Sequence, residues 1–192
     1  MMRVWKRIMA LAMCLALGVC GLGLAEQPKE FVDAPKGANV YGVTAGEPLR
    51  MGVALARAAE GIAARFDAAD FDIWGADELL SGAEYSAFVT LDPVERVLAV
   101  LIMAGYAEET YDAISELGLE ISGEAQALVK AVYKRYSGMS KGERGAWNAA
   151  VERGFRRGDG AQITLRIGEQ LVRYSFQADS ESWVLSGISI AQ

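Results

Sequence analysis

The pattern of apolar and polar positions changes along this 192-residue sequence, from spacings typical of helices to the alternation typical of strands. In the segment 92–106, the chain runs from Val97 to Ala104 without a charged residue. A helix formed there would be apolar on every side and would have to be buried on most of its faces. Because a membrane span needs about 20 apolar residues, this shorter stretch predicts a core helix around which the other elements pack.

Local residues specify where this central helix begins. Asp92 can accept hydrogen bonds from the first free backbone N–H groups of a helix. Pro93 suits the first helical position because its missing N–H would have no partner there. Glu95 completes a pattern that resembles a capping box. We therefore expect a well-defined helix start at Pro93.

Further helices are predicted before and after the central one. The stretch that follows Pro48 places four apolar residues on one face at helical spacing: Leu55, Ala59, Ile62 and Phe66. Ser81 and Glu84 form a capping box that predicts a short helix, with a strand over 85–91 as the alternative. Later helices are expected over Glu108–Leu117, from Ser122 to Tyr136, and after the capping box of Ser140 and Glu143.

The end of the chain alternates with a period of two residues. Three segments rich in Ile, Val, Tyr and Phe are predicted as strands: 162–167, 170–177 and 183–190. Gly168 and Glu169 form a two-residue turn with glycine first, which suits a type II′ hairpin. Helices followed by a three-stranded antiparallel meander predict an α+β fold, in which the N-terminal helical region packs on the apolar side of the C-terminal sheet.

The turn also sets the register of the meander. With Ile167 opposite Gln170, apolar residues meet at each following step: Leu165 with Val172, Ile163 with Tyr174 and Ala161 with Phe176. A five-residue connection over 178–182 then places three residues of the last strand against the second: Val184 opposite Phe176, Ser186 opposite Tyr174 and Ile188 opposite Val172.

This register predicts a binding surface on the outer face of the meander, on the side away from the core. Five residues of that face are the candidate binding residues: Arg166, Arg173, Gln177, Trp183 and Leu185. Polar side chains are expected there from solvent exposure alone, whereas a tryptophan among arginines has the composition enriched at interaction sites. The alternative is that Trp183 is covered by a helix or by the segment before residue 47.

The first 25 residues have the anatomy of a secretory signal peptide. Three basic residues precede an apolar run from Ile8 to Leu24, and Gly23 and Ala25 provide small residues where a signal peptidase reads the chain. We expect cleavage after Ala25, a flexible tether over residues 26–46, and a single α+β domain over residues 47–192. Within the tether, a short edge strand over residues 40–43 is the alternative. An uncleaved anchor is one alternative. Lipidation at Cys20 is another, although Val19 departs from the usual lipobox pattern.

The amino-acid composition limits which functions and binding partners we expect for this protein. The expected mature chain has a net charge of −9, with the acidic excess in residues 26–120. Nonspecific nucleic-acid binding needs Lys and Arg to neutralise phosphates, so no nucleic-acid partner is expected. The sequence has no histidine, and both cysteines precede residue 26, which excludes Ser-His-Asp and Cys-His catalysis and ordinary zinc sites in the mature chain. We predict no cofactor and no metal.

Three weaker patterns admit functional interpretations. The acidic segment 67–78 contains aspartates that could bind calcium, but their spacing misses the EF-hand pattern and a solvated loop is the simpler interpretation. Arg157-Gly158-Asp159 matches a tripeptide that some integrins recognise, and it is also good turn chemistry. Paired carboxylates can hydrolyse glycosides, but no motif selects two of the 25 acidic residues.

The sequence therefore favours a noncatalytic exported bacterial protein that binds an envelope or extracellular protein or glycan. A carboxylate-dependent glycan hydrolase is the alternative. A deep acidic cleft with two carboxyl groups at catalytic spacing would favour the hydrolase, whereas a shallow polar sheet face would favour the binding module. Contact with the membrane is expected only through the signal peptide or a lipidated Cys20.

The intact mass of the secreted protein tests the expected export. We expect the mass of a chain that begins at Glu26, because Gly23 and Ala25 direct cleavage to that bond. A mass that begins at Cys20 and carries added lipid would replace this prediction with the lipoprotein alternative.

Overall fold

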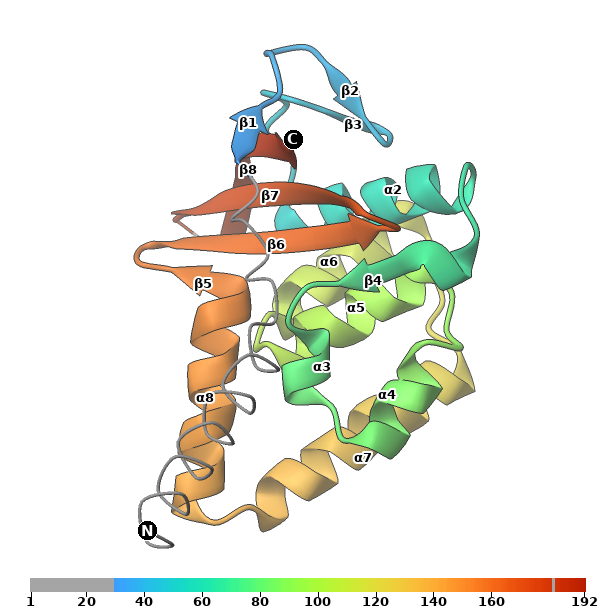
Figure 1. The fold of residues 1–192 in the computed structure, drawn as a ribbon, viewed down its shortest axis with the longest axis vertical. Coiled ribbons are helices and arrows are strands. Elements are labelled where there is room, and N and C mark those ends of the chain that lie inside the picture. Colours follow the sequence, from blue (N-terminus) through green and yellow to red (C-terminus); the bar gives the residue numbers. More distant parts are fainter. Residues whose placement is uncertain (1–29, 181) are drawn as a thin grey trace, which may run out of the picture. The chain divides into compact units, whose positions relative to one another are not determined.

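Helices make up most of the chain between Met51 and Phe155, and the long strands of an antiparallel sheet follow them, as Figure 1 shows. The computed structural model describes residues 30–180 and 182–192. The predicted signal peptide and the Cys20 lipidation site lie outside these residues. In the described part the helices are α2 (Met51–Ala63), α3 (Ala76–Leu79), α4 (Gly82–Phe88), α5 (Pro93–Met103), α6 (Ala107–Leu117), α7 (Gly123–Gly138) and α8 (Lys141–Phe155), with a 3-10 turn at Ala68–Asp70.

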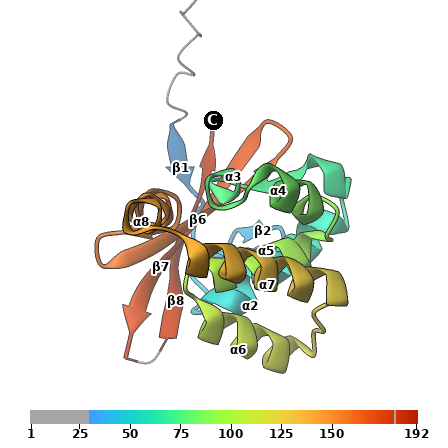
Figure 2. The same ribbon diagram turned by 90° about the horizontal axis from the view of Figure 1, so that it is seen from below.

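The main sheet has the strand order β1-β8-β7-β6-β4, and every pairing in it is antiparallel. Its strands are β1 (Phe31–Asp33), β4 (Phe71–Ile73), β6 (Gly160–Ile167), β7 (Gln170–Asp179) and β8 (Ser182–Ala191), with β5 (Arg156–Arg157) also paired to β6. Figures 1 and 2 show α2, α5 and α6 grouped together on one side of this sheet. The predicted α+β fold with helices packed on a C-terminal meander is confirmed.

The central helix α5 is buried along most of its length, as its continuous apolar sequence predicts. Asp92 caps it by accepting hydrogen bonds from the N–H groups of Val94 and Glu95, and Pro93 occupies the first turn. The predicted role of Glu95 was wrong. Its carboxylate accepts a 2.7 Å hydrogen bond from the backbone N–H of Ser122, so it joins the start of α5 to the start of α7.

The capping boxes predicted at Ser81 and Ser140 are both present, at the starts of α4 and α8. The alternative strand over 85–91 was wrong, because the cap at Ser81 starts a helix through Phe88. One residue of the first predicted helical face also differs. Phe66 lies beyond the end of α2 and is 41% exposed, with its ring packed edge-on against Tyr41.

Two segments predicted to be irregular contribute strands. The acidic segment 67–78 contains β4, because Phe71 and Ile73 alternate with Asp72 and are buried against the core. In the segment 26–46, expected to be a tether, β1 pairs with β8 and a small hairpin forms from β2 (Asn39–Val40) and β3 (Val43–Thr44). The β2–β3 hairpin overlaps the residues 40–43 considered as a short edge strand, whereas β1 and β4, with three residues each, were not recognised from the sequence.

The β6–β7 hairpin has the predicted register, with Ile167 opposite Gln170 and Ala161 opposite Phe176. The predicted β7–β8 register was wrong. Phe176 pairs with Leu185 instead of Val184, and the ladder shifts between Ser175 and Phe176. β7 continues to Asp179, so the connection is shorter than expected, and Ser186 is the extra residue of a β-bulge.

A buried arginine ties α5 to the edge of the sheet. Arg96 is only 2% exposed, and its guanidinium donates hydrogen bonds to four backbone carbonyl groups: those of Ala68, Phe71, Val89 and Leu91. These carbonyls come from the 3-10 turn, from β4 and from the segment that ends α4. One side chain therefore satisfies backbone acceptors from separate parts of the fold.

Replacing this arginine tests how far the fold depends on it. We expect Arg96→Met to lower the free energy of unfolding by about 3 kcal/mol or more, because buried carbonyls would lose a charged donor. Urea unfolding followed by circular dichroism measures the effect. The control Arg144→Met, at an exposed position of α8, is expected to change stability by less than about 0.5 kcal/mol. A loss below about 1 kcal/mol for Arg96→Met would show that these carbonyls find other donors.

Candidate functional site

The structure divides the five predicted binding residues between the two faces of the sheet. Arg166, Arg173 and Gln177 lie on the outer face, as predicted, because the β6–β7 register holds. Trp183 and Leu185 lie on the inner face of the sheet, where they pair with Ala178 and Phe176 of β7. The error follows from the β7–β8 register, because the bulge at Ser186 turns the part of β8 before it to the other face, whereas Ile188 stays on the predicted core face.

Trp183 and Leu185 join the sheet to the helices. The Trp183 ring packs edge-on against Tyr106, with ring centroids 5.8 Å apart. Its backbone N–H donates a 2.9 Å hydrogen bond to Oε1 of Glu109 on α6. Leu185 is 6% exposed, and its N–H donates to the carbonyl of Leu49 just before α2. The alternative interpretation, in which Trp183 is covered by helices, is the one that matches these contacts.

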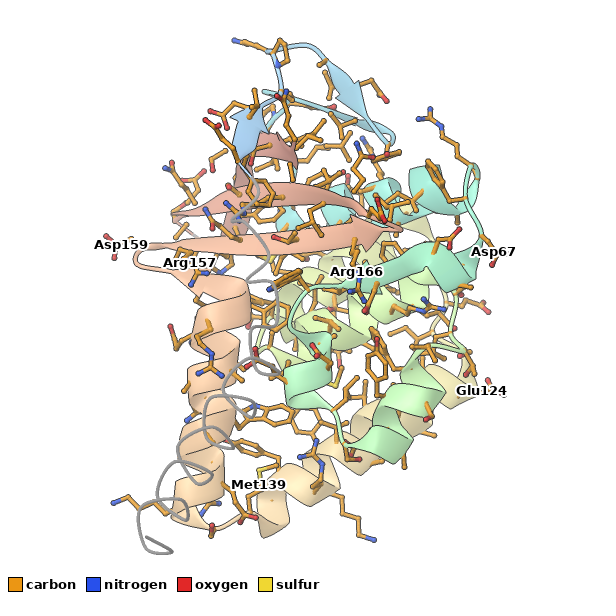
Figure 3. All side chains as sticks on the ribbon, in the orientation of Figure 1. Asp67, Glu124, Met139, Arg157, Asp159 and Arg166 are labelled. Carbon is orange, nitrogen blue, oxygen red and sulfur yellow. The ribbon has the colours of Figure 1, made fainter. Side chains whose placement is uncertain are left out.

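The outer face carries a stripe of arginines that begins at the β5–β6 turn. Arg157 pairs across the ladder with Gly160, and Arg166 follows near the other end of β6. At about 3.4 Å per residue, Gly160 and Arg166 are about 20 Å apart along the strand. Figure 3 shows Arg157 beside the turn and Arg166 beside β4. Arg173 lies between them, opposite Thr164.

Each arginine of this stripe has a different environment. Arg166 forms a 2.5 Å ion pair with Asp72, which also accepts a hydrogen bond from the Tyr85 hydroxyl. Arg173 stacks on the ring of Phe31, 3.5 Å from its centroid. Burial lowers the pKa of Arg173, and the positive charge of Arg157 lowers it further. Among the described residues, Arg157 and Arg173 have no carboxylate ion-pair partner.

Two aromatic residues extend the same face. Trp74 is 49% exposed, and its N–H donates to the carbonyl of Thr164, so it continues the β4 ladder past Ile73. We define the arginine face by six residues: Phe31, Trp74, Arg157, Arg166, Arg173 and Gln177. The sequence reasoning missed Phe31 and Trp74 because their segments were expected to be a tether and a loop. Trp74 directly follows the alternating apolar residues Phe71 and Ile73, a pattern too short to be recognised as a strand from the sequence alone.

An acidic depression lies near Trp183, with a volume of about 620 Å³. Glu108, Glu109 and Asp179 contribute to its lining. Burial raises the pKa of Glu109, although the hydrogen bond from the Trp183 N–H opposes this shift. Glu109 is 5% exposed, and its Oε2 has no hydrogen-bond partner among the described residues. Because Glu109 is almost fully buried and accepts a hydrogen bond from the backbone of β8, its contacts indicate a structural role.

The raised pKa of Glu109 gives a test with a defined sign. The folded state binds this proton more tightly than the unfolded chain, where the pKa is about 4.5. The contribution of Glu109 to stability is therefore fully present below about pH 4.5 and is lost as pH rises through the higher folded pKa.

As pH rises from about 4 to 7, we expect the unfolding free energy of Glu109→Gln to increase relative to that of the parent. Glutamine cannot ionise, and all other titrating groups are shared, so the difference isolates Glu109 with its neighbours Asp112 and Arg50. Urea unfolding at a series of pH values measures it. A difference that does not vary with pH would mean that Glu109 has an ordinary pKa.

The described residues contain neither a cluster suited to a metal ion nor a helix long and apolar enough to cross a bilayer. Of the aspartates considered for calcium, Asp67 caps the 3-10 turn and Asp72 is engaged by Arg166 and Tyr85. Protein-family models, curated proteins and solved structures were each compared with this chain, and none matched it.

Proposed function

We propose that this protein is an exported, noncatalytic binding module that uses the arginine face to hold an anionic polymer of the cell envelope. The observation that carries the proposal is the pair formed by Arg157 and Arg173. Burial and the positive charge of Arg157 both lower the pKa of Arg173, and neither arginine is paired with a carboxylate in the described residues. A bound anion would stabilise these charges.

The arrangement of the face favours a polymer over a small anion. The arginines are spread along about 20 Å of β6 rather than gathered around one point. A chain with repeated carboxylate or phosphate groups can pair with Arg157 and Arg173 in succession, and it would reach Arg166 in competition with Asp72. The planar guanidinium group suits both kinds of anion. Trp74 and Phe31 add flat apolar surface next to the charges, a combination enriched at interaction sites.

The acidity of the rest of the chain does not prevent this binding. The expected mature protein is net −9, but its acidic excess lies in residues 26–120, whereas residues 121–192 carry 10 basic and 7 acidic residues. At physiological ionic strength, charges more than about 8 Å apart are largely screened. An anion in contact with the arginine face is therefore governed mainly by the arginines.

Glycan hydrolysis, the alternative function, has weaker support. Its best candidate acid is Glu109, the carboxyl group whose pKa is raised by burial. A general acid must come within hydrogen-bond reach of the glycosidic oxygen. Glu109 is enclosed by the contacts that hold Trp183, and we therefore favour the binding module.

Immobilised polygalacturonate, a carboxylated polysaccharide, serves as the probe, with neutral dextran as the reference surface. We expect the purified protein to bind polygalacturonate, and the double variant Arg157→Ser/Arg173→Ser to bind at least about tenfold more weakly, because each charge-assisted hydrogen bond contributes about 1.5–3 kcal/mol. Biolayer interferometry at low and high salt measures the affinities, and binding should weaken as salt rises.

The matched control is Lys141→Ser/Arg144→Ser, which removes the same two charges from exposed positions at the start of α8. It should bind like the parent. Equal weakening in both double variants would show that only net charge matters. That result, or equal binding to dextran and polygalacturonate, would contradict the proposal.

A further inference from the structure

A pocket with a volume of about 380 Å³ lies between the C-terminal end of α5 and the helices α7 and α8. Figure 1 shows α7 and α8 diverging from the turn that joins them, and Met139 marks this turn in Figure 3. Val132 and Val151 are buried and form part of the floor. The volume is within the range of about 300–1,000 Å³ typical of small-molecule sites.

Aromatic side chains form walls that other residues hold in place. Trp147 and Tyr136 pack edge to face, with ring centroids 5.5 Å apart. The guanidinium of Arg135 lies over Trp147, 5.3 Å from the ring centroid, and is bound by both carboxylate oxygens of Glu84. Burial alone would raise the pKa of Glu84, but hydrogen bonds from Arg135 and Ser81 hold it below its usual value, so this support stays charged.

The polar rim has no net charge. Glu152 and Arg156 form a 3.1 Å ion pair, and they are the only charged residues that line the pocket in the described part of the chain. Arg156 also donates to the carbonyl of Ala104. A side chain at Gly105 would lie 3.2 Å from the Arg156 guanidinium, and its φ of +92° suits glycine. The ion pair with Glu152 of α8 and the hydrogen bond to Ala104 at the end of α5 therefore hold Arg156 at the rim.

Two other polar groups at the pocket are available to form hydrogen bonds with a ligand. The Asn148 amide and the Tyr136 hydroxyl line it and form no hydrogen bonds within the described residues. Asn148 offers both donors and an acceptor, and the tyrosine hydroxyl can do either. A purely apolar ligand would bury these groups without partners, at a cost of about 1–3 kcal/mol each. An ionic ligand would meet a rim whose charges already neutralise each other.

We infer that this pocket binds a neutral carbohydrate, with one sugar ring packed against Trp147 and Tyr136. The hydroxyl groups of a sugar donate and accept hydrogen bonds, which matches Asn148, Tyr136 and the Glu152–Arg156 pair. The apolar C–H face of the ring matches the flat aromatic surface. Only β5 contributes to both sites, with Arg156 at the pocket and Arg157 on the arginine face, and the inference does not depend on the proposed function.

Isothermal titration calorimetry with cellotetraose and tetra-N-acetylchitotetraose tests the inference. We expect saturable binding of at least one of these neutral oligosaccharides, with a dissociation constant of about 1 mM or lower. Asn148→Ala and Trp147→Phe should each weaken that binding by about tenfold, the equivalent of one lost hydrogen bond or stacking contact. Asn148 is exposed, so its replacement should not disturb the fold. Trp147 is only 9% exposed, so the melting temperature of Trp147→Phe is measured beside its binding.

Two controls separate this site from general effects. Arg144→Ala changes an exposed residue of α8 that does not line the pocket, and it should bind like the parent. The double variant Arg157→Ser/Arg173→Ser should bind the oligosaccharide as tightly as the parent does, even when it no longer binds polygalacturonate. The inference is overturned if neither oligosaccharide binds up to about 10 mM, or if Asn148→Ala and Trp147→Phe both bind as the parent does.

Discussion

The hydrogen bonds of Arg96 are the interaction on which the arrangement of the other elements depends. A guanidinium group in the core is tolerated because backbone carbonyls surround it, including those at the end of α4. This helix then positions two separate supports. Tyr85 binds Asp72 and thereby Arg166 on the sheet, while Glu84 binds Arg135 and thereby braces Trp147 in the helical pocket. Both candidate sites are therefore linked to one buried side chain.

Features encoded by neighbouring residues could be predicted from the sequence. The capping boxes at Ser81 and Ser140 each lie within four residues, and the β6–β7 register follows from the Gly168-Glu169 turn. The β7–β8 register was not encoded so locally. It depends on where β7 ends and on a bulge at Ser186, whose hydroxyl donates to the carbonyl of Ser175. A single extra residue turned Trp183 from the predicted outer face to the face that packs against the helices.

Other errors arose where tertiary contacts replaced a local partner. Glu95 has the spacing of a capping residue, but the N–H of Ser122 is a better-placed donor once α7 packs beside α5. Gly52 and Gly61 weaken α2 as an isolated helix. They are required because a side chain there would lie 1.9 Å from the Glu109 carbonyl oxygen and 2.2 Å from that of Tyr41. Such close approaches leave no periodic pattern in the sequence.

The pairing of β1 with β8 has a consequence for the order of assembly. β1 is the first described strand to leave the ribosome, and its only partner in the main sheet is the last one. The loop that their contact closes contains all the other elements, which makes it slow to form on its own. The core can be assembled beforehand, so that β1 adds to a finished edge. Until then, β8 presents an open strand edge, the kind of surface through which nascent chains associate with one another.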